Sequence, residues 1–362
     1  MSEYVQRVGR ALEAMELERI DALCLSVGSD LPYLTGYTAM PLERLTMLVM
    51  LPGHEPVLVV PELEAPRVDT SGGAFSLRAW SETEDPVLIV DELLGESRRV
   101  AIGDQTWTRF SLALQNIGWN RAWVPASDFM TCLRIVKSPF EIDALRTAAR
   151  TVDEVVDAMA AVRWSGRTER DVAREIIDRT RAGGHESVGF AIVASGPNGA
   201  SPHHEPTDRT IEHGDAIVVD FGGHQGGYAS DTTRMFVVGD PPEGVEEAYT
   251  VLRAAQEAAV DAVKPGVPAE SIDIVARTVI ADAGYGEYFI HRVGHGIGLD
   301  AHEAPYLVKG NEQLLKPSMA FSVEPGIYLP GRWGMRLEDI VVVTDAGVES
   351  LNTSDHAYRV VT

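Results

Sequence analysis

Five side chains of metal-binding type stand at the edges of apolar or glycine-rich stretches: Asp220, Asp231, His295, Glu324 and Glu338. Four of them are carboxylates, and buried carboxylates raise one another's pKa unless a proton or a cation lies between them. Two divalent cations would balance the four negative charges, and paired ions in hydrolytic sites share one water. Oxygen-rich ligation with one imidazole suits Mn²⁺ or Co²⁺, and Zn²⁺ less well. The residues therefore predict a dinuclear metal centre that performs hydrolysis.

The two aspartates are positioned by a predicted hairpin. Residues 216–219 form a short apolar strand that ends on Asp220, and a glycine-rich turn follows over residues 222–227. A second strand, residues 228–238, carries Asp231 near its start, so both carboxylates can face one pocket. On this stretch alone, a hairpin with two solvated aspartates is the alternative interpretation.

The predicted histidine ligand lies in a segment that holds three of the chain's ten histidines, His291, His295 and His302. Glycines at positions 294, 296 and 298 remove side chains around His295, which lets backbone and ligand approach closely. Their spacing differs from the dinucleotide-binding fingerprint, and the segment after His302 lacks the second histidine of a zincin helix.

The two glutamates follow a similar pattern at the ends of apolar strands. Residues 320–323 form a strand that ends on Glu324, and Glu338 lies on or beside a final strand, residues 340–343. Arg336, two residues before Glu338, shares its strand face. Each glutamate alone would be an ordinary ion-pair residue, so the prediction depends on the whole set.

The length of 362 residues predicts two domains, residues 1–134 and 135–362. In the first, a helix over residues 4–19 and short strands alternating with helices predict a small α/β domain. In the second, glycines at 166 and 184 recur 100 residues later at 266 and 284, each pair enclosing a helix. This repeat predicts a pseudo-twofold α+β fold whose site lies where the halves meet.

Composition excludes several classes of function. The formal net charge of −23 argues against a nucleic-acid partner. No apolar run approaches the roughly 20 residues of a membrane span, and no signal segment opens the chain. Cys24 and Cys132 lie in apolar contexts and are predicted to be buried thiols. We expect a cytoplasmic protein that forms a homodimer.

In their order and spacing, the five residues resemble the ligand set of the pita-bread metallopeptidases. The large N-terminal domain is similar to that of the aminopeptidase P and prolidase branch, which cleaves Xaa-Pro bonds. The resemblance implies that Asp220 binds one metal, that Asp231 and Glu338 bridge, and that His295 and Glu324 complete the pair.

The resemblance also implies roles for residues around the metals. His203 would lie over the substrate, His302 would stabilise the tetrahedral intermediate, and His291 would line the pocket wall. Arg336 would orient the ligands or bind substrate, and Glu324 would also move the proton of the attacking water.

The expected reaction is hydrolysis of the bond before proline in peptides or dipeptides. Several prolidases have a basic residue after the His-Glu-x-Pro segment, where this chain has Tyr306. That departure leaves both dipeptidase and aminopeptidase P activity open. The alternatives on the same fold are a creatinase-like enzyme that works without metal and a chaperone-like binding protein, both disfavoured by the intact ligand set.

Overall fold

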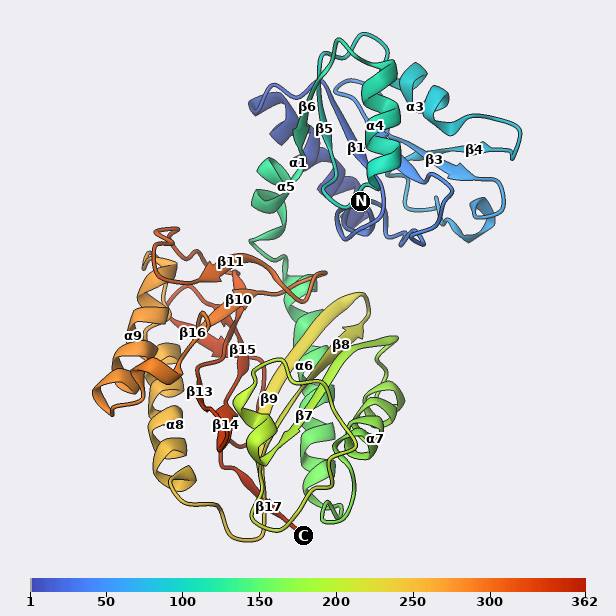
Figure 1. Cartoon of the computed structure of the whole chain (residues 1–362). Coiled ribbons are helices and arrows are strands. Elements are labelled where there is room, and N and C mark those ends of the chain that lie inside the picture. The colour runs from blue at the N-terminus through green and yellow to red at the C-terminus, as the bar shows by residue number, and fades with distance from the viewer. Residues whose placement is uncertain (1) are drawn as a thin grey trace. The chain divides into compact units, whose positions relative to one another are not determined.

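A computed structural model describes residues 2–362 and divides the chain into two compact units, Met1–Arg134 and Ile135–Thr362 (Figure 1). None of the helices in the described part is long and apolar enough to cross a bilayer. Each unit has its own apolar core and is described separately.

The N-terminal unit is built on one six-stranded sheet in the order β4-β3-β2-β1-β5-β6. The pairs β1–β2 and β2–β3 are antiparallel, whereas β1–β5, β3–β4 and β5–β6 are parallel. Its strands are β1 (Ala22–Leu25), β2 (Met47–Met50), β3 (Val57–Pro61), β4 (Ser76–Trp80), β5 (Arg99–Ile102) and β6 (Ala122–Pro125). Its helices are α1 (Glu3–Leu17), α2 (Asp30–Thr35), η1 (Ala65–Arg67), α3 (Pro86–Leu94), α4 (Thr108–Ile117) and α5 (Ser127–Arg134).

One prediction for this unit is wrong. Cys24 is buried on β1, as expected, but Cys132 is exposed. Cys132 lies on α5, whose buried face is formed by Phe129 and Met130, so the helical turn directs the thiol to solvent. An apolar sequence context therefore does not place a residue on the inner face of a helix.

The C-terminal unit contains a four-stranded sheet, β17-β9-β8-β7, a five-stranded sheet, β11-β10-β12-β15-β16, and the hairpin β13-β14. Helices α6 and α7 pack against the first sheet, and α8 and α9 pack against the second (Figure 1). The helices are α6 (Pro139–Ala160), α7 (Glu169–Ala182), η2 (Gly196–Ala200), α8 (Val245–Asp261), α9 (Ala269–Asp282) and η3 (Gly286–Tyr288). The strands are β7 (Ser187–Ser195), β8 (Ala216–Gln225), β9 (Tyr228–Val238), β10 (Gly294–Gly296), β11 (Glu303–Leu307), β12 (Ala320–Val323), β13 (Gly326–Leu329), β14 (Trp333–Arg336), β15 (Asp339–Val343), β16 (Val348–Ser350) and β17 (Arg359–Val361).

The 100-residue repeat is visible in the backbone hydrogen bonds. The Gly166 N–H donates to the Ile211 carbonyl at 2.9 Å, and the Gly266 N–H donates to the Leu315 carbonyl at 2.8 Å. Helices α7 and α9 each have 14 residues and start 100 residues apart. The predicted pseudo-twofold fold is confirmed.

The predicted turn after Asp220 is wrong in its extent. Strand β8 continues to Gln225, and the turn to β9 contains Gly226 and Gly227 alone. A Cβ on Gly222 would lie 2.1 Å from the Ser230 carbonyl oxygen, so this glycine is needed for close approach of neighbouring strands. Glycine within a strand therefore marks tight packing here, and the hairpin itself is present.

Glu338 lies beside the predicted strand, as expected, but that strand is not the final one and Arg336 does not share a strand with Glu338. Arg336 ends β14, Glu338 lies between β14 and β15, and two further strands, β16 and β17, follow. An isolated bridge between Thr233 and Glu338 holds this junction against β9. The junction thus brings a residue of the second half of the unit against the strand that carries Asp231.

Candidate metal centre

One cavity of about 740 Å³ in the C-terminal unit gathers all nine residues that the sequence nominated. Its lining comes from strands of both halves of the repeat and from the loop after β7. The lining residues are Gly189, Phe190, Ala191, Ile192, Pro202, His203, His204, Glu205, Pro206, Asp220, Asp231, His291, Arg292, His295, His302, Glu324, Arg336 and Glu338. The lining therefore combines apolar side chains with carboxylates, histidines and two arginines.

The five predicted ligands come from five different places in the fold. Asp220 and Asp231 lie on β8 and β9 of the first half, and His295 lies on β10 of the second. Glu324 follows the end of β12, and Glu338 lies between β14 and β15. Two compact groups result, one of His295, Glu324 and Glu338 and one of Asp220, Asp231 and Glu338. Within each group the possible ligand atoms lie within 4.8 Å of one another.

The carboxylates carry the electrostatic cost of burial. Burial raises the pKa of Asp231 and of Glu338 well above the usual range, and the neighbouring carboxylates raise both further. Burial also raises the pKa of Asp220, although the charge of Arg336 partly opposes the shift. Within residues 2–362, no lysine or arginine forms an ion pair with Asp231 or Glu338. The cluster therefore needs protons or cations to be stable.

Two carboxylate oxygens of the cluster are buried without a hydrogen-bond partner in the described chain, Oδ1 of Asp220 and Oε1 of Glu338. Such atoms are costly unless a ligand takes them. Glu338 belongs to both groups of ligand atoms, so one carboxylate reaches both. The donor set is made of hard oxygens with one imidazole, which fits divalent cations of the Mn²⁺ type. The residues present therefore fit a pair of divalent metal ions.

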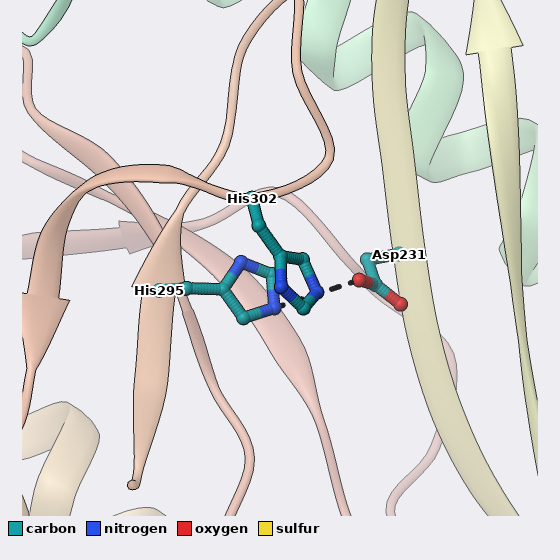
Figure 2. Close-up of side chains that lie close together, drawn as sticks. All are labelled: Asp231, His295 and His302. Atoms are coloured by element: carbon teal, nitrogen blue, oxygen red, sulfur yellow. Dashed lines mark ion pairs between the residues drawn. The ribbon is translucent and has the colours of Figure 1, made fainter. Parts of the chain in front are cut away.

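His295 is oriented by its neighbours. Its Nδ1 lies 3.2 Å from the Gly296 carbonyl oxygen, and the N–H at that position donates to it. The Nε2 atom then faces Asp231 Oδ2 at 3.7 Å (Figure 2). It also lies 3.3 Å from Glu324 Oε1. The hydroxyl of Ser322 accepts from the His295 backbone N–H at 3.0 Å. This geometry presents Nε2 as the ligand atom.

Glu324 differs from the other carboxylates. Burial raises its pKa, but the contact with His295 and the positive charge of Arg336 outweigh burial and hold the pKa at about 2. The Ser322 hydroxyl donates to its Oε1 at 3.2 Å. Glu324 is therefore ionised at neutral pH.

Arg336 is buried, and its guanidinium contacts three neighbouring side chains. It pairs with Asp220, donates to the Thr233 hydroxyl at 3.1 Å and donates to the Tyr328 hydroxyl at 2.7 Å. Thr233 in turn donates to Glu338 Oε2 at 2.7 Å. These contacts orient two of the predicted ligands, which favours the ligand-orienting role of Arg336 over substrate binding.

Sequence reasoning missed Thr233 and Tyr328. Thr233 is two residues beyond Asp231 on the same strand, so both side chains lie on the same face of the sheet. The alternation of side chains along a strand could therefore have identified Thr233 from the sequence. Tyr328 accepts from Arg336, and its hydroxyl lies 2.9 Å from His291 Nε2. No sequence pattern near Tyr328 indicated this contact.

The four predicted pocket residues outside the ligand set are all present at the cavity. His302 is exposed, and its ring stacks on His295. Although the side chain is exposed, partial desolvation by the cavity lining is the main cause that lowers the pKa of His302 to about 4. His291 is partly buried in the wall, and His203 is exposed at the cavity. In the described part of the chain no side chain hydrogen-bonds to His203, whereas His204 Nε2 lies 3.1 Å from a carboxylate of α7.

Comparison with known proteins agrees with this geometry. Residues 143–345 match metallopeptidase family M24, and residues 7–136 match the Creatinase/Prolidase N-terminal domain. The chain is 44% identical over 363 residues to the "Probable dipeptidase PepE" of Mycobacterium tuberculosis, covering 99% of this chain and 96% of that one. It is 36% identical over 354 residues to the "Xaa-Pro dipeptidase" of Lactobacillus helveticus, covering 94% and 95%.

A solved structure extends the likeness to three dimensions. The recombinant prolidase from Thermococcus sibiricus superimposes with a TM-score of 0.94 at 36% identity, covering 99% of each chain. A buried cluster of hard ligands on a pseudo-twofold α+β fold defines a metallopeptidase. The chain belongs to metallopeptidase family M24.

Proposed function

We propose that this protein is an Xaa-Pro dipeptidase that holds two divalent cations through Asp220, Asp231, His295, Glu324 and Glu338. One observation carries the proposal: buried carboxylates from both halves of the repeat converge on a cavity, with oxygens that the described chain leaves without a partner. The names of the relatives support a peptidase that acts at proline and disfavour a creatinase-like or chaperone-like protein.

Bound divalent cations would activate water and polarise the scissile carbonyl as Lewis acids. In this proposal Asp231 and Glu338 would be the ligands that both ions share. Glu324 accepts at a carboxylate oxygen the proton that the attacking water loses, and delivers it to the proline nitrogen as the C–N bond breaks. His203 and His302 donate hydrogen bonds to the developing oxyanion and the leaving group.

The preference for dipeptides is supported by a cation in the cavity wall. Arg292 lines the cavity, and its guanidinium lies over the ring of Tyr306, 4.4 Å from the ring centroid. One of its terminal nitrogens is 3.5 Å from His302 Nδ1. Stacking on an aromatic ring positions a guanidinium while leaving its edge free for a carboxylate. Arg292 can therefore bind the C-terminal carboxylate of a dipeptide. Tyr306 cannot do so in the same way, because it carries no positive charge.

The test is a substrate comparison on metal-loaded protein. An Xaa-Pro dipeptide should be hydrolysed with a higher kcat/KM than the matching Xaa-Pro-Yaa tripeptide, and an Xaa-Ala dipeptide should be a poorer substrate. Preference for the tripeptide would establish aminopeptidase P activity instead. We further propose Mn²⁺ as the metal, from the oxygen-rich ligand set. The homodimer and the cytoplasmic location stay predictions.

A further inference from the structure

Glu169 is a buried carboxylate outside the metal centre. It is the first residue of α7 and is fully buried. Glu169 Oε1 accepts the backbone N–H and the hydroxyl of Ser195, each at 2.7 Å, and the Asn198 amide at 3.0 Å. Its other oxygen accepts the backbone N–H of Thr207 at 3.1 Å and the Thr207 hydroxyl at 2.7 Å. Both oxygens are thus surrounded by donors from the last residue of β7 and from the segment that follows it.

That segment, residues 196–210, is here called the His203 loop. Five of its residues, 202–206, line the cavity. His204 lies 3.1 Å from Glu169 Oε2 through its Nε2 atom, which must carry the proton because a carboxylate can only accept. Burial opposes ionisation of Glu169, yet the hydrogen bonds from Ser195 and Thr207 outweigh it and lower its pKa to about 2. The anchor is therefore a charged acceptor at neutral pH.

The start of α7 also binds the loop through its backbone. The Glu169 N–H donates to the Arg209 carbonyl, and the Arg170 N–H donates to the Thr207 carbonyl, both at 3.1 Å. Residues 204–207 have no regular secondary structure, so side-chain anchoring decides their conformation. On the cavity side, Arg336 donates to the Pro202 carbonyl at 3.3 Å. The stretch that contains His203 is consequently held from both sides.

The second half of the repeat provides an internal comparison. The residue 100 positions after Glu169 is Ala269, the first residue of α9. There the Ala269 N–H donates to the Gln313 carbonyl at 2.9 Å, so the backbone contact is kept without a carboxylate. The corresponding loop, residues 308–314, does not line the cavity in the described structure. A fully buried carboxylate at the first position of the helix therefore occurs in the half whose loop reaches the site, whereas the other half anchors its loop through Glu270, a partly exposed carboxylate at the second position.

We infer that Glu169 is a positioning residue for the peptidase reaction, which fixes His204 and the His203 loop so that the ring of His203 stays directed to the substrate. The inference rests on the proposed function for its catalytic consequence but not for the anchoring itself. A displacement of about 1 Å in a catalytic group can reduce a rate by roughly 10²-fold. Loosening the loop should therefore reduce kcat/KM while the metals remain bound.

The first experiment compares Glu169→Gln with Glu270→Gln in the full-length, metal-loaded protein. In either orientation of its side-chain amide, Gln would place the NH₂ group against N–H donors that now face a carboxylate oxygen. The anchor is therefore lost with little change in side-chain volume. Glu270, on α9, accepts the Gly310 N–H at 2.8 Å and anchors the loop that does not line the cavity. Amide hydrogen exchange should become about tenfold faster or more in residues 196–210 of Glu169→Gln alone. Unchanged exchange in that loop would overturn the inference, whether or not the protein cleaves Xaa-Pro bonds.

The second experiment asks whether Glu169 acts through the histidine. In the wild-type background Glu169→Gln should lower kcat/KM by about 10²-fold with both metals retained. In a His203→Ala background it should cost about threefold or less, because residues that act as a unit are not additive. An equal loss in both backgrounds would indicate a structural role and overturn the inference.

The role of Glu169 can still be tested if Glu169→Gln does not fold or if the wild-type protein is inactive on Xaa-Pro dipeptides. If Glu169→Gln does not fold, Thr207→Val removes one hydroxyl donor from the same carboxylate and should change exchange and kcat/KM in the same direction by less. A Thr207→Val variant with wild-type exchange in residues 196–210 would then contradict the anchor. If the wild-type protein does not cleave Xaa-Pro dipeptides, the proposed function fails while the exchange experiment still tests Glu169.

Discussion

The imidazole rings of His295 and His302 lie nearly face to face, with centroids 3.7 Å apart and planes inclined by 29° (Figure 2). His295 is buried on β10, whereas His302 is exposed on the loop before β11. Because Asp231, His295 and His302 could together hold an ion, His302 is itself a candidate ligand. The proposed role is different: His302 contacts the substrate while its ring stacks on His295, which binds the metal.

His302→Ala should keep both metal ions and lose about 10²–10³ in kcat, the effect of one missing oxyanion donor. KM should change less, because the interaction strengthens as charge develops on the carbonyl oxygen. Metal content and kcat are measured on the same preparation. Loss of an ion from the variant would show that His302 is a metal ligand. An unchanged kcat would show that His302 only packs against its neighbours.

Removal of metal should abolish hydrolysis and lower the thermal midpoint at neutral pH. The reason is the cluster of buried carboxylates, which lack compensating cations once the ions are gone. Dialysis against a chelator, followed by calorimetry and re-addition of Mn²⁺, measures both effects. Full activity in protein shown by elemental analysis to be metal-free would exclude the mechanism.

Glu338→Gln should have opposite effects on the loaded and the metal-free protein. It removes a carboxylate that both groups of ligand atoms share, so at most one ion should remain bound. In the metal-free protein it relieves repulsion with the other buried carboxylates, so the thermal midpoint should rise above that of metal-free wild type. Glu349→Gln, on exposed β16, is the control and should change neither quantity. Two tightly bound ions in Glu338→Gln would contradict the bridging assignment.

Arg292→Ala should raise KM for an Xaa-Pro dipeptide by about 10–10²-fold, the value of one hydrogen bond to a charged group. The same dipeptide with an amidated C-terminus should be affected little, because it has no carboxylate to bind. Arg332→Ala is a matched control, since Arg332 also lies near an aromatic ring, 5.9 Å from the centroid of Trp333, but does not line the cavity. Equal changes for the acid and the amide would rule out carboxylate binding by Arg292.

The stability supplied by Glu169 should depend on pH in a defined window. Its pKa is about 2 in the folded chain, below the ordinary glutamate value of 4.5 that applies to the unfolded chain. Its contribution is therefore complete above pH 4.5 and is lost as the pH falls toward 2. The shift corresponds to about 3 kcal/mol. The difference in unfolding midpoint between wild type and Glu169→Gln, measured with chelator present, should narrow across that window. A constant difference from about pH 7 to pH 3 would show that ionisation of Glu169 does not contribute.

The gathering of the predicted ligands could be foreseen because each lies in or beside a strand, as Asp231 does near the start of β9 and Glu324 does directly after β12. Strand pairing then brings these positions together, whatever the loops between the strands do. Glycine was harder to interpret, since Gly222 lies within β8 and serves close packing. The Glu169 anchor could not be predicted, because its donors lie 26–38 residues away, at the end of β7 and in a loop without periodicity.

The glycines that flank His295 affect how mutations in this segment should be interpreted. A Cβ on Gly294 would lie 1.9 Å from the Ser322 carbonyl oxygen, and one on Gly296 would lie 2.2 Å from that of Ala304. In a mutational scan, every substitution at these two positions should therefore reduce the yield of folded protein before it affects turnover. Apparent essentiality at positions 294 and 296 reports on assembly of the sheet, whereas essentiality at His295 between them reports on the metal centre.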